Sequence, residues 1–326
     1  MDEPILSVRN LTVHYIKEDS TVRAVNGLSF NLANKETLGL VGETGAGKTT
    51  TALSIMRLIP NPPGKIVAGE ILFKGDNILK YNKYHLLRMR GHDISMIFQD
   101  PMTSLNPVLK VGDQIAEVIH IHKKLSNKEA NIEAMKMLEV VGISSDRFND
   151  YPHQFSGGMK QRVVIAISLA CNPKILIADE PTTALDVTIQ AQVLEMMGAL
   201  KKNFNTSMIL ISHDLGVIAE VCNRVGIMYA GNIVEIGNLE DIYVNGSHPY
   251  TRGLFGSIPD LDSDTERLKP IEGLMPDPTH LPPGCPFYPR CPDRLPECKM
   301  KQPDAVEVSP GHLIRCVHAK KNEETV

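Results

Sequence analysis

The residues best suited to carry chemistry begin with an eight-residue segment that fits the pattern G-x-x-x-x-G-K-[ST]. It reads Gly42-Glu43-Thr44-Gly45-Ala46-Gly47-Lys48-Thr49 and lies between an apolar run and a helical pattern. Glycines let the backbone curl so that successive amides face one anion, and the positive end of the following helix adds to the attraction. Lys48 would reach the outer phosphates of a nucleotide, and Thr49 would offer a hydroxyl to Mg²⁺. The sequence predicts a phosphate-binding loop, in which we include Thr50, rather than a plain glycine-rich turn.

Two adjacent acids follow another apolar run. Ile175-Leu176-Ile177-Ala178 ends in Asp179 and Glu180, so both carboxylates should emerge at the sheet edge where α/β proteins bind ligands. Asp179 would help to hold Mg²⁺, and Glu180 is suited to polarise the attacking water as a general base. Acids after a strand are more often an ordinary solvated strand end. The phosphate-binding loop upstream favours the catalytic interpretation.

A second candidate anion site lies in Phe155-Ser156-Gly157-Gly158-Met159-Lys160-Gln161-Arg162, which precedes a helical run over 163–170. Ser156 stands where a helix N-cap would, and Gly157 and Gly158 would expose backbone amides at the helix start. Such amides attract anions. One nucleotide cannot easily fill both anion sites of the same chain.

Strand-like and helix-like segments alternate over most of the chain, as expected of a sheet covered by helices. We predict strands at 37–41, 94–98, 175–178, 207–211 and 225–229, and helices at 48–58 and 187–203. A helical insert interrupts this order from residue 111 to about residue 142. Ser126 and Glu129 are spaced as a capping box within it, and Gly142 provides a stop.

The chain changes character beyond about residue 246, where prolines become frequent and long regular elements are not expected. Four of the six cysteines lie there: Cys285, Cys291, Cys298 and Cys316. In a reducing compartment a cysteine cluster points to a metal before disulfides. Thiolates select zinc or an iron–sulfur cluster, although this spacing lacks the C-x2-C pairs typical of structural zinc. Reduced thiols without a metal are also possible.

The composition is that of an ordinary soluble protein, with 42% hydrophobic and 22% charged residues and a formal net charge of −4 over 326 residues. This balance gives no support to bulk nucleic-acid binding. No run approaches the roughly 18 to 20 apolar residues that span a bilayer, and the acidic start is unlike a signal peptide. We therefore expect a protein of the cytoplasm.

Taken together, these motifs resemble the ABC ATPase family over roughly residues 5–245. In that family the signature Leu-Ser-Gly-Gly-Gln grips the γ-phosphate of a nucleotide held by a partner subunit, and here Ser156, Gly157 and Gly158 match it. The resemblance implies that Tyr15 stacks on adenine, that Gln99 senses Mg²⁺ and the membrane partner, and that His213 is the switch histidine. Ala184-Leu185-Asp186 matches the loop that communicates across the dimer. Each match alone is equally compatible with a structural residue, but all occur in the family's order.

The signature departs from the usual form in two positions, with Phe155 in place of leucine and Met159 in place of glutamine. Backbone amides and Ser156 still supply the phosphate contacts, so we expect a working half-site. Only the side-chain contact of the missing glutamine is placed in doubt.

The C-terminal part resembles the extension of the dipeptide/oligopeptide and nickel importer ATPases. The similarity lies in His248-Pro249-Tyr250-Thr251, Pro282-Pro283-Gly284-Cys285 and Arg290-Cys291. Some members of that family carry a [4Fe-4S] cluster there. The resemblance therefore ranks a cluster on the four cysteines first, reduced thiols second and zinc third.

We predict an α/β fold, a P-loop NTPase of the ABC ATPase type with a mixed sheet core. The nucleotide-binding domain would cover residues 1–245, with a helical subdomain at about 100–165, and a proline- and cysteine-rich extension would cover 246–326. Catalytic roles fall to Glu180, His213 and Gln99. Thr49, Gln99 and Asp179 would hold Mg²⁺.

The predicted function is ATP hydrolysis that energises import of dipeptides or oligopeptides through closure of an ATPase dimer. The expected partners are a second ABC ATPase subunit, identical or homologous, two integral membrane permease subunits and an extracytoplasmic peptide-binding protein, with no nucleic acid. The chain would then be peripheral, on the cytoplasmic side of the cell membrane. Import of nickel or another small solute is the first alternative, and a soluble ABC ATPase without a transport role is the second.

Overall fold

The structure is a computed structural model, and it describes residues 3–183, 185–257 and 270–319. The chain forms two compact units, each built from several segments of the sequence. Unit 1 comprises Met1–Leu6, Leu32–Thr37 and Phe73–Val221. Unit 2 comprises Ser7–Asn31, Leu38–Leu72 and Cys222–Val326.

Unit 1 contains three parallel strands, β6 (Ile94–Ile97), β7 (Ile175–Asp179) and β8 (Ser207–Ile211). Strand β7 pairs with β6 on one side and with β8 on the other, so that Ala178 lies opposite both Ile97 and Leu210. All residues of these strands are buried, which explains why they read as uninterrupted apolar runs. The carboxyl ends of the three strands therefore meet at one edge.

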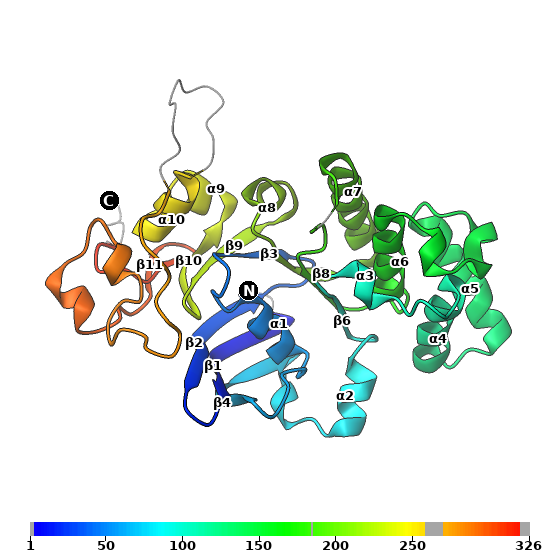
Figure 1. The fold of residues 1–326 in the computed structure, drawn as a ribbon, viewed down its shortest axis with the longest axis horizontal. Helices are drawn as coiled ribbons and strands as arrows, with labels where there is room; N and C mark the ends of the chain where they lie inside the picture. Colours follow the sequence, from blue (N-terminus) through cyan, green and yellow to red (C-terminus); the bar gives the residue numbers. More distant parts are fainter. Residues whose placement is uncertain (1–2, 184, 258–269, 320–326) are drawn as a thin grey trace. The chain divides into compact units, whose positions relative to one another are not determined.

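Helices make up most of the rest of unit 1, and α4, α5 and α6 lie side by side in the green part of the chain (Figure 1). Helix α6 contacts β6 and α7 as well as α3, α4 and α5. The remaining elements of unit 1 are β5 (Asp76–Asn77), α2 (Lys83–Met89), α3 (Pro101–Ser104), α4 (Val111–Lys123), α5 (Asn127–Val140), α6 (Gly157–Leu169), α7 (Val187–Phe204) and α8 (Leu215–Val221). Short 3₁₀ turns cover Ile78–Lys80, Ser145–Asn149 and Pro152–Gln154.

Capping residues predicted from the sequence set two of these helix starts. Ser126 and Glu129 form the capping box of α5, in which the Ser126 backbone N–H donates to the Glu129 carboxylate at 2.9 Å. Ser156 caps α6, where its hydroxyl accepts from the Met159 amide. An N-cap of this kind contributes about 1 kcal/mol. Both predicted caps are confirmed.

Unit 2 contains a mixed sheet in which β3 (Thr37–Val41) runs parallel to β9 (Arg224–Tyr229). Strand β9 pairs antiparallel with β10 (Asn232–Asn238), which pairs antiparallel with β12 (His312–Ile314). The edge strand is β11 (Val306–Ser309), antiparallel to β12. The C-terminal extension therefore adds two strands to the sheet that carries β3.

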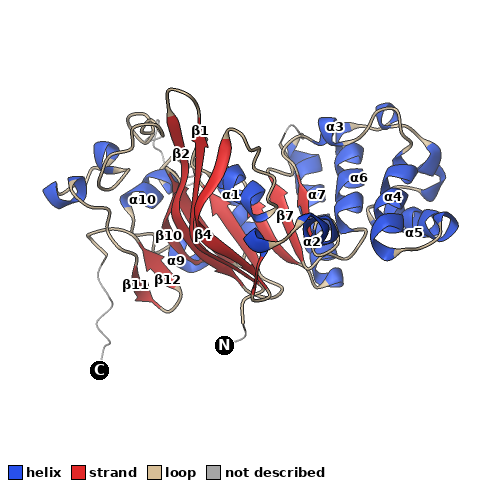
Figure 2. Ribbon diagram, turned by 90° about the horizontal axis from the view of Figure 1, so that it is seen from below, coloured by secondary structure: helices blue, strands red, loops and turns tan. Residues whose placement is uncertain are grey.

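A second group of strands in unit 2 has the order β2-β1-β4 (Figure 2). These strands are β1 (Leu6–Ile16), β2 (Thr21–Leu32) and β4 (Gly64–Phe73). The helices and 3₁₀ turns of unit 2 are α1 (Lys48–Ile55), α9 (Leu239–Tyr243), α10 (Pro249–Phe255), Tyr288–Arg290 and Pro296–Lys299. Among the helices in the described part of the chain, none is long and apolar enough to cross a membrane.

The predicted segments agree with the structure except near their ends. Helix α1 stops at Ile55, three residues before the predicted end. Arg57 adopts a left-handed conformation, with φ of 50°, and the Leu58 amide turns back to the Leu53 carbonyl. The predicted helical insert consists of two helices, α4 and α5, and the predicted capping box begins the second one. The mixed sheet is confirmed, and the described residues after 246 form only short helices and strands.

Candidate active site

The predicted phosphate-binding loop joins β3 to α1 in unit 2, and its glycines meet strict steric demands. Gly45 and Gly47 have φ of 84° and 98°, a region that costs other residues energy. A Cβ atom on Gly47 would lie 2.5 Å from the Ala24 carbonyl oxygen. The Ala46 carbonyl accepts from the Gly231 amide at 3.0 Å, which ties the loop to the turn after β9. These steric contacts and this hydrogen bond restrict the backbone conformation of the loop.

Lys48 is 7% exposed and turns back onto its own loop. Its ammonium donates to the Gly42 carbonyl at 2.6 Å and to the Glu43 carbonyl at 3.2 Å. Thr49, the next residue, is exposed. Tyr15 comes from β1, and its hydroxyl lies 3.5 Å from that of Thr50. The structure thus places Tyr15 next to the first turn of α1.

Glu180 occupies the centre of the predicted hydrolytic site in unit 1. Its carboxylate accepts from the Gln99 side-chain amide at 2.9 Å and from the Thr183 hydroxyl at 3.0 Å. The second carboxylate oxygen lies 3.5 Å from Nδ1 of His213. The Glu180 side chain is 16% exposed and that of His213 is 69% exposed. The carboxylate is therefore held firmly, while the histidine faces solvent.

Parallel pairing brings these residues together although they are far apart in sequence. Gln99 follows β6, Glu180 follows β7 and His213 follows β8, so all three emerge at the shared carboxyl edge of the strands. Glu180 has φ of 49°, a conformation that is uncommon for a residue with a side chain and often marks functional sites. Its amide is anchored on the Ile211 carbonyl at 2.9 Å. Three residues predicted from the sequence thus form one cluster.

Asp179 is the last residue of β7 and is 2% exposed. A buried carboxylate is expected to be paired or to bind a metal ion.

Thr183 was not predicted, and no spacing rule in the sequence pointed to it. Its hydroxyl donates to Glu180 from the turn after β7. Ala184 of the predicted communication loop lies outside the described residues, and Asp186 caps α7 by accepting from the Ile189 amide.

The signature segment occupies the start of α6 in unit 1, with Ser156 and Gly157 exposed. A Cβ atom on Gly158 would lie 2.5 Å from Cγ2 of Ile189, so a side chain there would require Ile189 to shift. The two unusual residues contact one arginine. The Arg147 guanidinium lies 4.3 Å from the centre of the Phe155 ring and donates to the Met159 sulfur at 3.5 Å. Arg147 therefore contacts both unusual side chains, while Ser156 and Gly157 at the helix start remain exposed.

The four cysteines of the C-terminal extension line one small cavity of about 10 Å³ in unit 2. The Cys285 amide donates to the Cys298 carbonyl at 2.7 Å, so backbone pairing holds this part of the cavity. Burial raises the pKa of Cys285 to about 11 and raises the pKa values of Cys291 and Cys316 as well. These thiols are therefore protonated at neutral pH.

The described part of the chain contains no group of three or more His, Cys, Asp or Glu side chains placed to hold a metal ion. The cavity has a volume of about 10 Å³, which suits a single water molecule. The expected [4Fe-4S] cluster thus gains no support from the structure. Cysteine thiols are the right donor type for such a cluster, but the four thiols are not placed to hold a metal ion among the described residues.

Comparisons with protein families identify two matching models. The family model "ABC transporter" matches residues 25–183, and the model "Oligopeptide/dipeptide transporter, C-terminal region" matches residues 234–298. The chain is 51% identical to the Dipeptide transport ATP-binding protein DppD of Bacillus subtilis, covering 96% of this chain and 94% of the relative. It is 47% identical to the Oligopeptide transport ATP-binding protein OppD of Escherichia coli, covering 96% and 93%.

Solved structures show the same fold. The dimeric bacterial ABC transporter cassette MJ0796 has a TM-score of 0.64 at 25% identity, covering 72% of this chain and 98% of its own. The protein cbiO1 from Clostridium perfringens, part of the ABC transporter complex cbiONQ, has a TM-score of 0.65 at 26% identity, covering 75% and 93%. On its sequence, its fold and its Glu180 cluster, the chain belongs to the ABC transporter family and is one of its ATPase subunits.

Proposed function

We propose that this chain hydrolyses ATP to energise the import of dipeptides or oligopeptides. The observation that carries the proposal is the convergence of Gln99, Glu180 and His213 at one sheet edge. The cargo class follows from the relatives, which are named as dipeptide and oligopeptide transport proteins, and from the matching C-terminal family model. The chain itself would contact nucleotide rather than peptide.

Within this proposal the phosphate loop binds ATP and the Glu180 cluster hydrolyses it. Lys48 would leave the Gly42 and Glu43 carbonyls and take up the outer phosphates, since a phosphate offers a charged acceptor in their place. Thr49, Asp179 and Gln99 would hold Mg²⁺, which neutralises developing charge on the phosphates. Glu180 would accept a proton from the attacking water, with Gln99 and Thr183 holding its carboxylate in place.

We further propose that two ATPase subunits form a dimer in which each signature completes the other subunit's nucleotide site. Support comes from the exposed start of α6, where Ser156, Gly157 and Gly158 present backbone groups at a helix N-terminus. ATP would draw the two subunits together, and hydrolysis would let them separate. Co-purification identifies the partner as a second copy of this chain or as a homologous subunit.

The membrane partners would be two permease subunits, which receive peptide from an extracytoplasmic binding protein. Exposed apolar side chains follow β6 in unit 1, where Phe98, Val108 and Leu109 are 43%, 75% and 41% exposed, and they would be available to a membrane partner. Such exposed apolar groups are typical of interaction sites when they gather. The chain would thus be peripheral, on the cytoplasmic face of the membrane.

Reconstitution tests the cargo and the transport role together. The chain is combined with candidate permease and binding proteins in vesicles, and ATP turnover is followed while the binding protein is loaded with peptide, with nickel, or with neither. Stimulation by the peptide-loaded protein alone supports the proposal. Stimulation by the nickel-loaded protein would reassign the cargo, and turnover without any co-purifying membrane protein would favour a non-transport ATPase.

Metal uptake by the cysteines is a separate proposal, which rests on the donor set alone: four thiols around one cavity. An iron–sulfur cluster would be structural, because ATP hydrolysis needs no redox step. Anaerobic purification followed by iron, sulfide and zinc analysis tests it. About four irons and four sulfides per chain would support a [4Fe-4S] cluster, whereas a metal-free protein with four titratable thiols would discard it.

A further inference from the structure

Glu43 links the phosphate loop to the C-terminal extension through two different groups. Its backbone N–H donates to the Tyr250 hydroxyl at 3.0 Å. Both of its carboxylate oxygens accept from Nη1 of Arg290 at 3.0 Å. Its carbonyl oxygen is one of the two that receive the Lys48 ammonium. One residue of the loop thus connects the extension to the lysine that the proposed function assigns to ATP.

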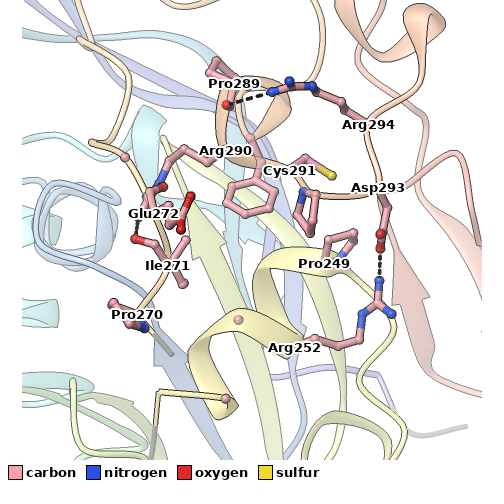
Figure 3. A pocket seen from close by; sticks show the side chains of 15 residues that line it. Pro249, Arg252, Pro270, Ile271, Glu272, Pro289, Arg290, Cys291, Asp293 and Arg294 are labelled. Atoms are coloured by element: carbon pink, nitrogen blue, oxygen red, sulfur yellow. Dashed lines mark hydrogen bonds and ion pairs between the residues drawn. The ribbon is translucent and has the colours of Figure 1, made fainter. Parts of the chain in front are cut away.

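The guanidinium of Arg290 is held in one position by burial and by hydrogen bonds to the backbone. Its side chain is 5% exposed, and the guanidinium donates to the backbone carbonyls of Glu272 at 3.0 Å and Ile271 at 3.2 Å. Figure 3 shows the Arg290 side chain beside these two residues, at the pocket of the extension. Because these two carbonyls of the extension anchor the guanidinium, we expect Arg290 to determine where the Glu43 carboxylate lies.

Tyr250 is equally constrained, because it belongs to a buried aromatic cluster. The ring centroids of Tyr250, Tyr229 and Phe287 are 4.6 to 5.3 Å apart, and none of the three side chains is more than 1% exposed. The Arg290 guanidinium lies 5.8 Å from the Tyr229 ring and 5.9 Å from the Phe287 ring. Burial raises the pKa of Tyr250, so its hydroxyl stays neutral at physiological pH.

We infer that Arg290 and Tyr250 are positioning residues for nucleotide binding, which fix the shape of the phosphate loop and neutralise the carboxylate of Glu43 beside it. The inference rests on the proposed role of the loop in binding ATP. Without Arg290, the Glu43 carboxylate would stand unpaired two residues before Gly45, where it would repel phosphates and hold the Lys48 ammonium. The extension would therefore set ATP affinity without touching the nucleotide.

A charge-removal cycle on the full-length chain tests this inference, with MgATP affinity measured by calorimetry. Arg290→Met should weaken binding about tenfold, the usual value of a hydrogen bond to a charged group. Adding Glu43→Gln should restore affinity to within about threefold of wild type, because no carboxylate then remains unpaired. Arg252→Met is the matched control: Arg252 is another arginine of the extension, paired with Asp293 rather than with the loop, and should change affinity less than twofold.

The cycle separates an electrostatic role from a merely structural one. If Arg290→Met leaves affinity unchanged, or if the double variant binds as weakly as Arg290→Met, the inference is overturned. Should Arg290→Met fail to fold, Arg290→Lys and Tyr250→Phe take its place, and each must weaken binding about threefold with an unchanged unfolding midpoint. Lys48→Ala distinguishes the two levels: if it binds ATP as wild type does, the proposed function of the loop itself is wrong.

Discussion

The phosphate loop and the Glu180 cluster are built from different parts of the chain. In the loop the main chain carries the function, because glycines such as Gly45 and Gly47 allow a curve that side chains would block. In the cluster the side chains carry it, because three strands deliver Gln99, Glu180 and His213 to one edge. Binding of ATP should therefore be sensitive to added atoms, and hydrolysis to the removal of single functional groups.

The largest effect is expected from Glu180→Gln, which removes the proposed base and keeps the shape of the side chain. Turnover should fall about a thousandfold, within the range that general base catalysis contributes. ATP affinity should stay within about threefold of wild type, since the phosphate loop is unchanged. Steady-state turnover and equilibrium binding measure the two quantities. If ATP binding is lost together with turnover, the separation between binding by the phosphate loop and hydrolysis by the Glu180 cluster is wrong.

Gly47→Ala should show the opposite pattern. An added Cβ atom would lie 2.5 Å from the Ala24 carbonyl oxygen, at a φ of 98°. The strain should amount to about 2 kcal/mol, or about a thirtyfold loss of ATP affinity. Gly45→Ala is the control, because it has a similar backbone conformation with no neighbouring atom within 4 Å. Equal losses in the two variants would show that the close approach to Ala24 is irrelevant.

Acid should weaken the part of unit 2 that supports the loop. Burial lowers the pKa of His248 from 6.5 to about 3, and its Nδ1 accepts from the Tyr250 amide. Below pH 6.5 the histidine of the unfolded chain binds a proton, whereas the folded chain keeps it neutral down to about pH 3. The free energy of unfolding is therefore highest above pH 6.5 and decreases as the pH falls toward 3. At pH 5 it should be lower by about 2 kcal/mol. Denaturant unfolding at several pH values measures it, and His248→Asn, which keeps an acceptor, should flatten the dependence.

Thr183→Val is expected to have the smallest effect. It removes the hydroxyl that donates to Glu180 at 3.0 Å and conserves the volume of the side chain. Turnover should fall about fivefold, as for one hydrogen bond of about 1 kcal/mol, with unchanged ATP affinity. Turnover equal to that of wild type would show that Gln99 alone suffices to hold the carboxylate.

The sequence predicted the loop, the strand ends and the cap of α6 because each depends on a local pattern. The phosphate loop needs glycines at fixed spacing, and β7 reads as an apolar run that ends in acids. The convergence of Gln99, Glu180 and His213 followed from family resemblance rather than from spacing. Parallel pairing then supplied the physical reason.

Contacts between distant residues could not be predicted in this way. Glu43 and Arg290 are 247 positions apart, and no periodicity relates a glycine-rich loop to an arginine next to a cysteine. The four cysteines share one cavity, as their clustering suggested. Their thiols are nevertheless not arranged around a metal ion in the described residues. The number of cysteines was visible in the sequence, but the distances between them depend on the packing of a proline-rich chain.

Single-turnover hydrolysis at saturating ATP tests most directly whether the phosphate loop serves binding and the Glu180 cluster serves hydrolysis. Wild type, Gly47→Ala and Glu180→Gln are loaded with enough MgATP to fill their sites, and the rate of phosphate formation is measured. Gly47→Ala should then recover to within about threefold of wild type, while Glu180→Gln should stay about a thousandfold slower at every ATP concentration. A Glu180→Gln chain that cleaves bound ATP at the wild-type rate would contradict the account.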